Sequence, residues 1–377
     1  MAEFQIIQGH VLEVLRTLPS NSVHCVITSP PYFPALRSYC GDPVKWPDGW
    51  IGSLGDEETP QEFINHLVSI FAEARRVLRD DGSFWLNIGD SYAKHNKWKG
   101  EGIKKKDLLC IPWRLGLALQ DDGWYLRNDC IWAKPNCLPE SVQDRFGRSH
   151  EYILHFTKTS SNYFDHLAVR EPASEVSLKR IAQKNFKNQK GGEKDYGKTG
   201  VNKSRSSRKT IENFAKNPGR NKRTVLSIPV ARLKHKHFAS FPEKLPEVCI
   251  KSSTSEMGVC SMCGSPFIRQ VDKTRVPTRP AKNNKKDQSG KSNRDHQRHV
   301  TFYETKGWAA SCDCGVPPSP AIILDPFNGS GTTGLASLKA SRSYIGIELS
   351  PEYVEISRER LLSVNPLYVE EAEILTR

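Results

Sequence analysis

The sequence has no long hydrophobic run, no internal repeat and no secretion signal, and each absence excludes a class of protein. Only 37% of its 377 residues are hydrophobic, and no stretch approaches the roughly 18 apolar residues that a membrane-spanning helix needs. The N-terminus, Met-Ala-Glu-Phe-Gln, lacks the basic and apolar regions of a secretory signal. We therefore expect a cytoplasmic protein with no membrane partner, long enough for one large domain or two smaller ones.

Acidic residues are scarce in two stretches that together carry the whole positive excess of the chain. The formal net charge is +13, and residues 174–224 contain 15 Lys and Arg against 4 Asp and Glu, whereas residues 271–300 contain 9 against 3. Both stretches are rich in Asn, Ser, Gly and Lys, so we expect mobile loops or binding arms. A solvated surface is the simple alternative, but such concentrated charge favours a polyanionic partner.

Strand and helix patterns alternate through the rest of the chain. Thr59, Pro60 and Glu62 have the spacing of a helix start, and an apolar stripe with helical period follows. We expect this helix to end at the Asp-Gly pair 81–82, with a strand after it. The alternation predicts an α/β sheet covered by helices on both faces. Expected strands are 4–9, 23–28, 83–88, 128–133, 152–156, 321–324 and 343–347, and further helices are expected at 11–18, 111–119, after 331 and from 351.

The apolar strand 23–28 is followed by an unusual turn, Ser-Pro-Pro-Tyr, at residues 29–32. Neither proline can donate a backbone hydrogen bond, so the strand must stop there. The carbonyl groups of this segment are free to accept hydrogen bonds, and the ring of Tyr32 is free to stack. The turn therefore suits an enzyme that holds a planar ring with an exocyclic amino group.

A glycine-rich turn at residues 325–334, Asp-Pro-Phe-Asn-Gly-Ser-Gly-Thr-Thr-Gly, joins a second apolar strand to a helix. Its glycines let the backbone approach a ligand closely. No Lys-Ser or Lys-Thr pair follows them, which excludes a phosphate loop, and Asp325 suits a cationic cofactor better than a phosphate. Glu348 ends the next strand and is placed to bind two ribose hydroxyls. The alternative is a plain tight connection between strand and helix.

The two turns resemble motifs of a known enzyme family. Residues 325–332 look like the S-adenosylmethionine-binding motif of DNA amino-methyltransferases, and residues 28–32 look like their catalytic motif. The catalytic motif comes first, as in the permuted β group, and residues 237–242, His-Phe-Ala-Ser-Phe-Pro, resemble a further cofactor segment of that group. The resemblance implies a Rossmann-like, S-adenosylmethionine-dependent methyltransferase fold that is circularly permuted and carries basic insertions.

The family's roles carry over to matching residues of this sequence. Ser29 and the Pro30 carbonyl would accept hydrogen bonds from the target amine, while Tyr32 would stack on a base flipped out of double-stranded DNA. Methyl transfer is then an in-line displacement that depends on positioning, so Cys25 and Cys40 are expected to be structural. The implied catalytic residues are Ser29, Pro30, Pro31 and Tyr32, and the implied cofactor-binding residues are Asp325, Phe327, Asn328, Gly329, Gly331, Thr332, Glu348, His237, Ser240 and Phe241.

The target base and the partners are less closely defined by the sequence. Ser29 favours the cytosine-N4 branch of the family, and adenine N6 stays open because some adenine enzymes also carry serine. Methylation of RNA or of a glutamine amide is the enzymatic alternative, and a non-catalytic zinc and nucleic-acid-binding protein is the alternative from another class. The sequence leaves open a cognate restriction endonuclease and the oligomeric state.

The sequence departs from the family at two histidines. The first strand usually ends in Gly-Asp near the cofactor adenine, but here the pair is Gly9-His10. An acid also usually precedes the catalytic strand, where this chain has His24. A histidine at the adenine edge would make cofactor binding weaker or dependent on pH, but we expect surface or packing roles for both.

The ten cysteines are scattered apart from one cluster. Without an export signal, reduced thiols or a metal are favoured over disulfides. The cluster consists of two short pairs, each followed by a glycine, as metal-binding knuckles require. Unliganded surface thiols are the alternative, and the second pair is tighter than the usual C-x-x-C. The predicted ligands of a structural zinc ion are Cys260, Cys263, Cys312 and Cys314.

DNA contact is expected from the two basic stretches. The features above divide the chain into five predicted segments. The loop 34–50, with Arg37, Tyr39, Trp46 and Trp50, would help to extrude the base or close the pocket, or would only pack onto the domain. The segments are 1–157, the catalytic half; 158–224, the basic target-recognition insertion; 225–250, a return to the core with the cofactor segment; 251–320, a zinc knuckle and basic loop; and 321–377, the cofactor-binding half.

Overall fold

The computed structural model describes residues 2–34, 43–94, 98, 102–172, 219–230, 241–277 and 299–364. The chain divides into two compact units. Unit 1 comprises Met1–Ala168, Arg223–Phe267 and Ala310–Arg377, and unit 2 comprises Val169–Lys222 and Ile268–Ala309. Within the described ranges, no helix is both long and apolar enough to cross a membrane.

Unit 1 is built on an eight-stranded sheet with the strand order β1-β16-β15-β2-β5-β7-β6-β10. All neighbours run parallel except β7, which is antiparallel to both β5 and β6. The strands of this sheet are β1 (Phe4–Gln8), β2 (Val23–Thr28), β5 (Leu78–Ile88), β6 (Tyr125–Ala133), β7 (His150–Thr157), β10 (Val225–Ser227), β15 (Ile322–Asp325) and β16 (Ser343–Glu348).

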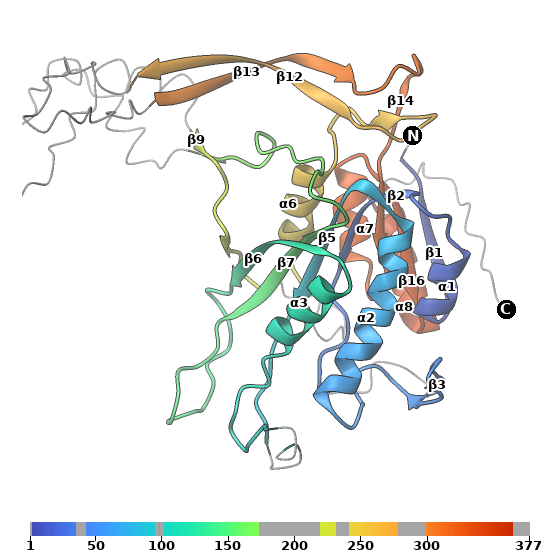
Figure 1. The fold of residues 1–377 in the computed structure, drawn as a ribbon, viewed down its shortest axis with the longest axis vertical. Helices are drawn as coiled ribbons and strands as arrows, with labels where there is room; N and C mark the ends of the chain where they lie inside the picture. The colour runs from blue at the N-terminus through green and yellow to red at the C-terminus, as the bar shows by residue number, and fades with distance from the viewer. Residues whose placement is uncertain are drawn as a thin grey trace, which may run out of the picture. The chain divides into compact units, whose positions relative to one another are not determined.

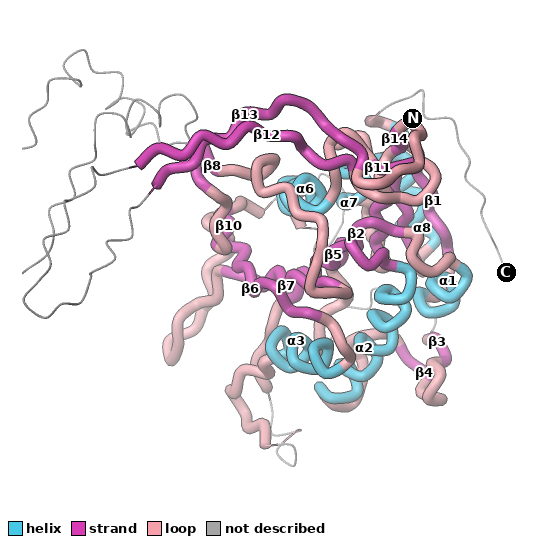
Figure 2. The backbone as a smooth tube through the Cα atoms, turned by 45° about the horizontal axis from the view of Figure 1, so that its top comes forward, coloured by secondary structure: helices cyan, strands magenta, loops and turns pink. Residues whose placement is uncertain are grey.

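Helices cover both faces of the sheet, as the sequence predicted (Figure 1). In Figure 2, β2, β5 and β7 lie between α6 and α7 on one side and α2 and α3 on the other. Successive residues of a strand point to opposite faces of the sheet and so belong to different hydrophobic clusters. Val26 and Phe84 pack in the cluster with α1–α3, and Cys25 and Trp85 pack in the cluster with α6–α8. The helices are α1 (Val11–Thr17), α2 (Pro60–Val77), α3 (Ile111–Asp121), α6 (Lys244–Ser253), α7 (Thr332–Lys339) and α8 (Pro351–Leu362).

Helix α2 begins as predicted and ends earlier than predicted. The Thr59 side chain accepts a hydrogen bond from the Glu62 amide, and the Glu62 carboxylate accepts one from the Thr59 amide, which completes a capping box. The expected end at residues 81–82 is wrong, because the helix stops at Val77 and β5 starts at Leu78. Leu78 pairs with Val23 on β2, and the next pair is Ser83 with Cys25. The Asp-Gly pair therefore lies in the irregular part of β5, where the register shifts.

Two short antiparallel strand pairs complete the described part of unit 1. The first joins β3 (Val44–Lys45) to β4 (Ile51–Gly52), within the loop that follows the Ser-Pro-Pro-Tyr turn. The second joins β11 (Val259–Cys260) to β14 (Pro318–Ser319) and so brings together chain segments nearly 60 residues apart.

Unit 2 consists, in its described part, of two antiparallel strand pairs. Strands β8 (Glu171–Pro172) and β9 (Gly219–Arg220) form one pair, and β12 (Phe267–Pro277) and β13 (His299–Ala310) form a long ribbon. The sequence predicted mobile loops or binding arms here, and residues 271–277 and 299–300 of the second basic stretch lie in the paired strands of this ribbon. The Arg269 guanidinium lies 4.3 Å from the centre of the Trp308 ring, so a cation–π contact links the two strands.

Candidate functional site

The sheet brings the two predicted turns together at one edge. Strands β2 and β15 are parallel neighbours, so the turns at their carboxyl ends emerge side by side. The Thr28 hydroxyl donates a hydrogen bond of 2.6 Å to a carboxylate oxygen of Asp325, across 297 residues of sequence. The Ser-Pro-Pro-Tyr turn and the glycine-rich turn therefore form one structural site.

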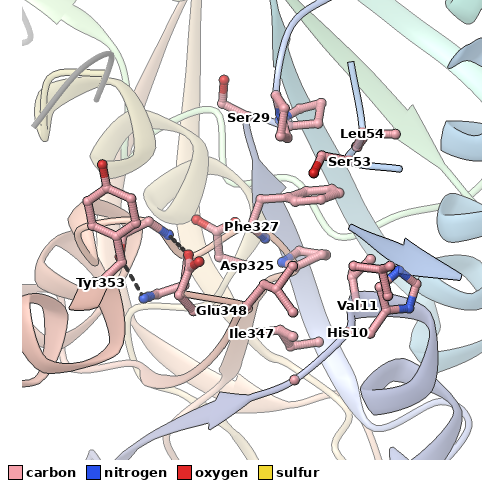
Figure 3. Close-up of a pocket in the computed structure, with 18 of the residues that line it drawn as sticks. His10, Val11, Ser29, Ser53, Leu54, Asp325, Phe327, Ile347, Glu348 and Tyr353 are labelled. Atoms are coloured by element: carbon pink, nitrogen blue, oxygen red, sulfur yellow. Dashed lines mark hydrogen bonds between the residues drawn. The ribbon is translucent and has the colours of Figure 1, made fainter. Parts of the chain in front are cut away.

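A pocket opens where these turns meet. In Figure 3, Glu348 and Tyr353 lie on one side, His10 and Val11 lie on the other, and Asp325 and Phe327 lie between them. Most of the predicted site residues line it: Ser29, Pro30, Pro31, Tyr32, Phe241, Asp325, Phe327, Asn328, Gly329, Thr332 and Glu348. His237 and Ser240 lie outside the described residues.

Asp325 is the most strongly perturbed acid of the pocket. Its side chain is almost fully buried, and burial raises the pKa of its carboxyl to about 6. The carboxylate accepts hydrogen bonds from the hydroxyls of Thr28 and Thr333, both at 2.6 Å, and from the Phe327 amide at 3.0 Å. These three donors hold a negative charge in a place where a cationic ligand would be its natural partner.

Glu348 holds the glycine-rich turn in place from the end of β16. One carboxylate oxygen accepts a hydrogen bond of 2.7 Å from the Gly329 amide, and the other accepts one of 2.9 Å from the Ser350 amide. Burial raises the pKa of this carboxyl. Since each oxygen has a further lone pair, the geometry still permits hydrogen bonds from two ligand hydroxyls.

Among the predicted cofactor residues that the structure describes, Gly331 alone is not part of the pocket lining. It is the N-cap of α7 with φ of +75°, a left-handed conformation that favours glycine. A side chain there would place its Cβ 2.9 Å from the Cβ of Ser357 on α8. Gly331 therefore allows α7 to begin tightly against α8.

The ring of Tyr32 is anchored by a polar network that sequence reasoning missed. Its hydroxyl donates to the Glu151 carboxylate at 2.9 Å and accepts from the Asn87 amide at 2.7 Å. The Asn87 amide also lies 3.3 Å from the Ser29 hydroxyl, and the Lys134 ammonium pairs with Glu151. Because Asn87, Glu151 and Lys134 come from three separate strand regions, no local pattern could have grouped them.

The opposite wall of the pocket comes from the loop after the Ser-Pro-Pro-Tyr turn. The ring of Trp46 lies edge-on to His10, with 5.1 Å between ring centres, and stacks on His66 at 4.3 Å. Trp50 also stacks on His66, at 4.9 Å. The two tryptophans thus pack the loop onto α2, and Trp46 additionally lines the pocket. Arg37 and Tyr39 of this loop lie outside the described residues.

The environment of both unusual histidines favours the uncharged ring. Burial lowers the pKa of His10, which lines the pocket, and lowers the pKa of His24 to about 4. His24 accepts a hydrogen bond of 3.0 Å from the Ile322 amide, so it ties β2 to the start of β15. Cys25 beside it is fully buried, whereas Cys40 lies outside the described residues.

The sequence is similar to known DNA methyltransferases over most of its length. The sequence model of a DNA methylase family, the N6 and N4 methyltransferases, matches residues 23–261 and 316–359. The chain is 34% identical to the type II methyltransferase M.XycI of Xanthomonas campestris pv. cyanopsidis, over 96% of this chain and 88% of that protein. It is 33% identical to the type II methyltransferase M.SmaI of Serratia marcescens, over 95% of this chain and 90% of that protein.

Solved structures agree at the level of the fold. PvuII DNA methyltransferase, named as cytosine-N4-specific, superposes with a TM-score of 0.55 at 19% identity, over 97% of this chain and 88% of that one. A protein of Thermus thermophilus described as a DNA modification methylase, complexed with S-adenosyl-L-methionine, gives a TM-score of 0.51 at 18% identity, over 99% of each chain.

Proposed function

This chain belongs to the DNA methylase family of N6 and N4 amino-methyltransferases, and on that premise we propose that it transfers a methyl group from S-adenosylmethionine to the N4 amine of a flipped cytosine. The observation that carries the proposal is the 2.6 Å hydrogen bond between Thr28 and Asp325. It joins the turn that would hold the target base to the turn that would hold the cofactor. Adenine N6 is the alternative target.

The cofactor would lie along the acidic side of the pocket. Asp325 would attract its cationic methionine part, Glu348 would accept hydrogen bonds from the ribose hydroxyls, and Phe327 would pack against it. His10 replaces the family's usual acid near the adenine, and its buried neutral ring would face that end of the cofactor.

The target base would enter between the cofactor and the Ser-Pro-Pro-Tyr turn. An exocyclic amine is a weak nucleophile because its lone pair is delocalised into the ring. The Ser29 hydroxyl and the Pro30 carbonyl would accept its two hydrogens out of the ring plane, which directs the nitrogen lone pair toward the methyl group. Asn87 and Glu151 would keep Tyr32 in position to stack on the base, so that alignment lowers the barrier.

Serine at position 29 supports cytosine N4 over adenine N6, and the order of the two motifs supports the permuted β group. DNA would be held by the basic stretches, whose lysines and arginines suit phosphate contacts. Most of these residues lie outside the described ranges. The type II relatives suggest that the chain is the modification partner of a restriction endonuclease.

The test of the proposed function is to express the chain in a host without DNA methylation and to map modified bases by single-molecule sequencing. The expected result is N4-methylcytosine at one recurring sequence. N6-methyladenine at a recurring sequence would keep the enzyme class and reverse the choice of base. Unmodified DNA, together with purified protein that binds DNA but not S-adenosylmethionine, would favour a non-catalytic nucleic-acid-binding protein.

We expect the affinity for S-adenosylmethionine to fall at mildly acidic pH. The pKa of Asp325 is raised to about 6, so the carboxyl is mostly ionised at neutral pH and mostly protonated below about pH 6. The cationic cofactor binds the ionised form, so its dissociation constant should rise about tenfold between about pH 7 and about pH 5. The raised pKa of Glu348 acts in the same direction. Isothermal titration calorimetry across this range measures the effect.

The Asp325→Asn variant is the control for this pH dependence. It should bind the cofactor weakly at every pH, with a shallower slope that reflects the remaining titratable groups of the pocket, Glu348 and His10. A melting curve at each pH confirms that the protein is folded. An affinity that is the same at both ends of the range would remove Asp325 from the cofactor site.

A further inference from the structure

Four cysteine side chains converge in unit 1 at a place that the catalytic pocket does not use. The Sγ atoms of Cys260, Cys263, Cys312 and Cys314 all lie within 4.8 Å of one another. Four thiolates around one zinc ion, with Zn–S bonds of about 2.3 Å, stand about 3.8 Å apart at the corners of a tetrahedron. All four are free thiols, and Cys260 is only 2% exposed, so the cluster is more than a group of surface cysteines.

The backbone holds the two cysteine pairs in position. Pairing of β11 with β14 places Cys260 opposite Pro318, close in sequence to the second pair. The Gly264 amide donates a hydrogen bond of 2.8 Å to the Cys260 carbonyl, which closes the tight turn of a metal-binding knuckle. Gly264 has φ of +70° and Gly315 has φ of +69°, so a left-handed glycine follows each pair.

Side chains of the core fasten the first knuckle to the main sheet. The His24 ring nitrogen Nε2 lies 3.2 Å from the Gly264 carbonyl oxygen, while its other nitrogen accepts from the Ile322 amide. The Arg79 guanidinium donates a hydrogen bond of 2.9 Å to the Cys263 carbonyl. A Cβ on Gly264 would come within 2.6 Å of this guanidinium, so the Arg79 side chain packs directly against the glycine.

We propose that Cys260, Cys263, Cys312 and Cys314 bind one structural Zn²⁺ ion. Four thiolates complete the tetrahedral shell and leave no position for a substrate, so the metal has no catalytic part. The chain between the two pairs carries β12 and β13, and the ion would fix both ends of that segment to the unit that contains the sheet. The family match stops at residue 261 and resumes at 316, so Cys260 lies within the matched residues and the other three cysteines lie between the two matched ranges.

The first test measures the metal in full-length protein that is purified under reducing conditions without an affinity tag or added metal. Inductively coupled plasma mass spectrometry should find about one zinc per chain. The Cys312→Ser/Cys314→Ser double variant should retain less than about one tenth of it, because two thiolates hold zinc poorly. Cys137→Ser is the matched control, since Cys137 is a half-buried thiol outside the cluster, and it should keep the full content.

The second test keeps the proposal open to refutation if the double variant does not fold. Wild-type protein that is stripped of metal and loaded with Co²⁺ should show thiolate-to-cobalt charge-transfer absorption and the visible bands of a tetrahedral site. Folded wild-type protein without zinc and without this spectrum would overturn the proposal, as would a disulfide among the four cysteines. Neither readout depends on methyl transfer, so the result is independent of the proposed function.

Discussion

Replacement of Tyr32 by alanine is expected to reduce methyl transfer at least about 100-fold while leaving the affinity for S-adenosylmethionine nearly unchanged. Stacking of a base on an aromatic ring is worth about 1–3 kcal/mol, and the in-line displacement additionally depends on how that base is held. Tyr32 lies at the pocket beside the Ser29 hydroxyl and is anchored through Asn87 and Glu151. Single-turnover transfer of a labelled methyl group to DNA measures the loss, and calorimetry measures cofactor binding.

Two companion variants separate the possible causes of this loss. Tyr32→Phe keeps the ring and removes the hydroxyl that bonds to Glu151, so it should lose less than about tenfold if stacking dominates. Tyr125→Ala removes a tyrosine that is 49% exposed on β6, and it should behave like the unmodified protein. Normal turnover by Tyr32→Ala would exclude the stacking role, and equal losses in the alanine and phenylalanine variants would assign the effect to the hydroxyl network.

Replacement of Glu348 by alanine is expected to raise the dissociation constant for S-adenosylmethionine about 100-fold. A hydrogen bond to a charged group contributes about 1.5–3 kcal/mol, and the variant loses both the proposed ribose contacts and the bonds that hold Gly329 and Ser350. The rate at saturating cofactor should fall much less, since Glu348 does not touch the target base in the proposed arrangement. Calorimetry and the dependence of the rate on cofactor concentration measure the two effects.

Glu352→Ala provides the matched control, because Glu352 is exposed in the first turn of α8, four residues further along the chain. It should bind the cofactor normally. A melting curve distinguishes loss of the cofactor site from loss of the fold in Glu348→Ala. An unchanged dissociation constant in a folded Glu348→Ala protein would remove this residue from the site.

The features that could be predicted from the sequence are those that short-range chemistry controls. The prolines at 30 and 31 cannot donate to the ladder of a central strand, so β2 ends at Thr28, and the Thr59 to Glu62 spacing forms its capping box within one helical turn. The alternation of strands and helices likewise predicted a sheet covered by helices. The spacing of apolar residues within each segment indicates its secondary structure and its buried face without reference to distant residues.

The features that the sequence did not predict concern elements whose strand partners lie elsewhere in the chain. The Asp-Gly pair at 81–82 has the chemistry of a turn, yet pairing with β2 draws the strand back to Leu78. The composition of the second basic stretch left loops and binding arms open, and the pairing of β12 with β13 gives its two ends the structure of a ribbon. In both cases the hydrogen bonds of a distant strand outweigh local propensity.

The sequence by itself determined the identity of the two turns, and with them the family, because each motif is a short run whose side chains act through local geometry. Only the tertiary structure decided that they form one site, since the parallel pairing of β2 with β15 sets Thr28 against Asp325. It alone also placed Asn87, Glu151 and Lys134 around Tyr32 and set Gly331 against α8, where α7 begins. These contacts depend on the order of strands in the sheet, which no local run of residues encodes.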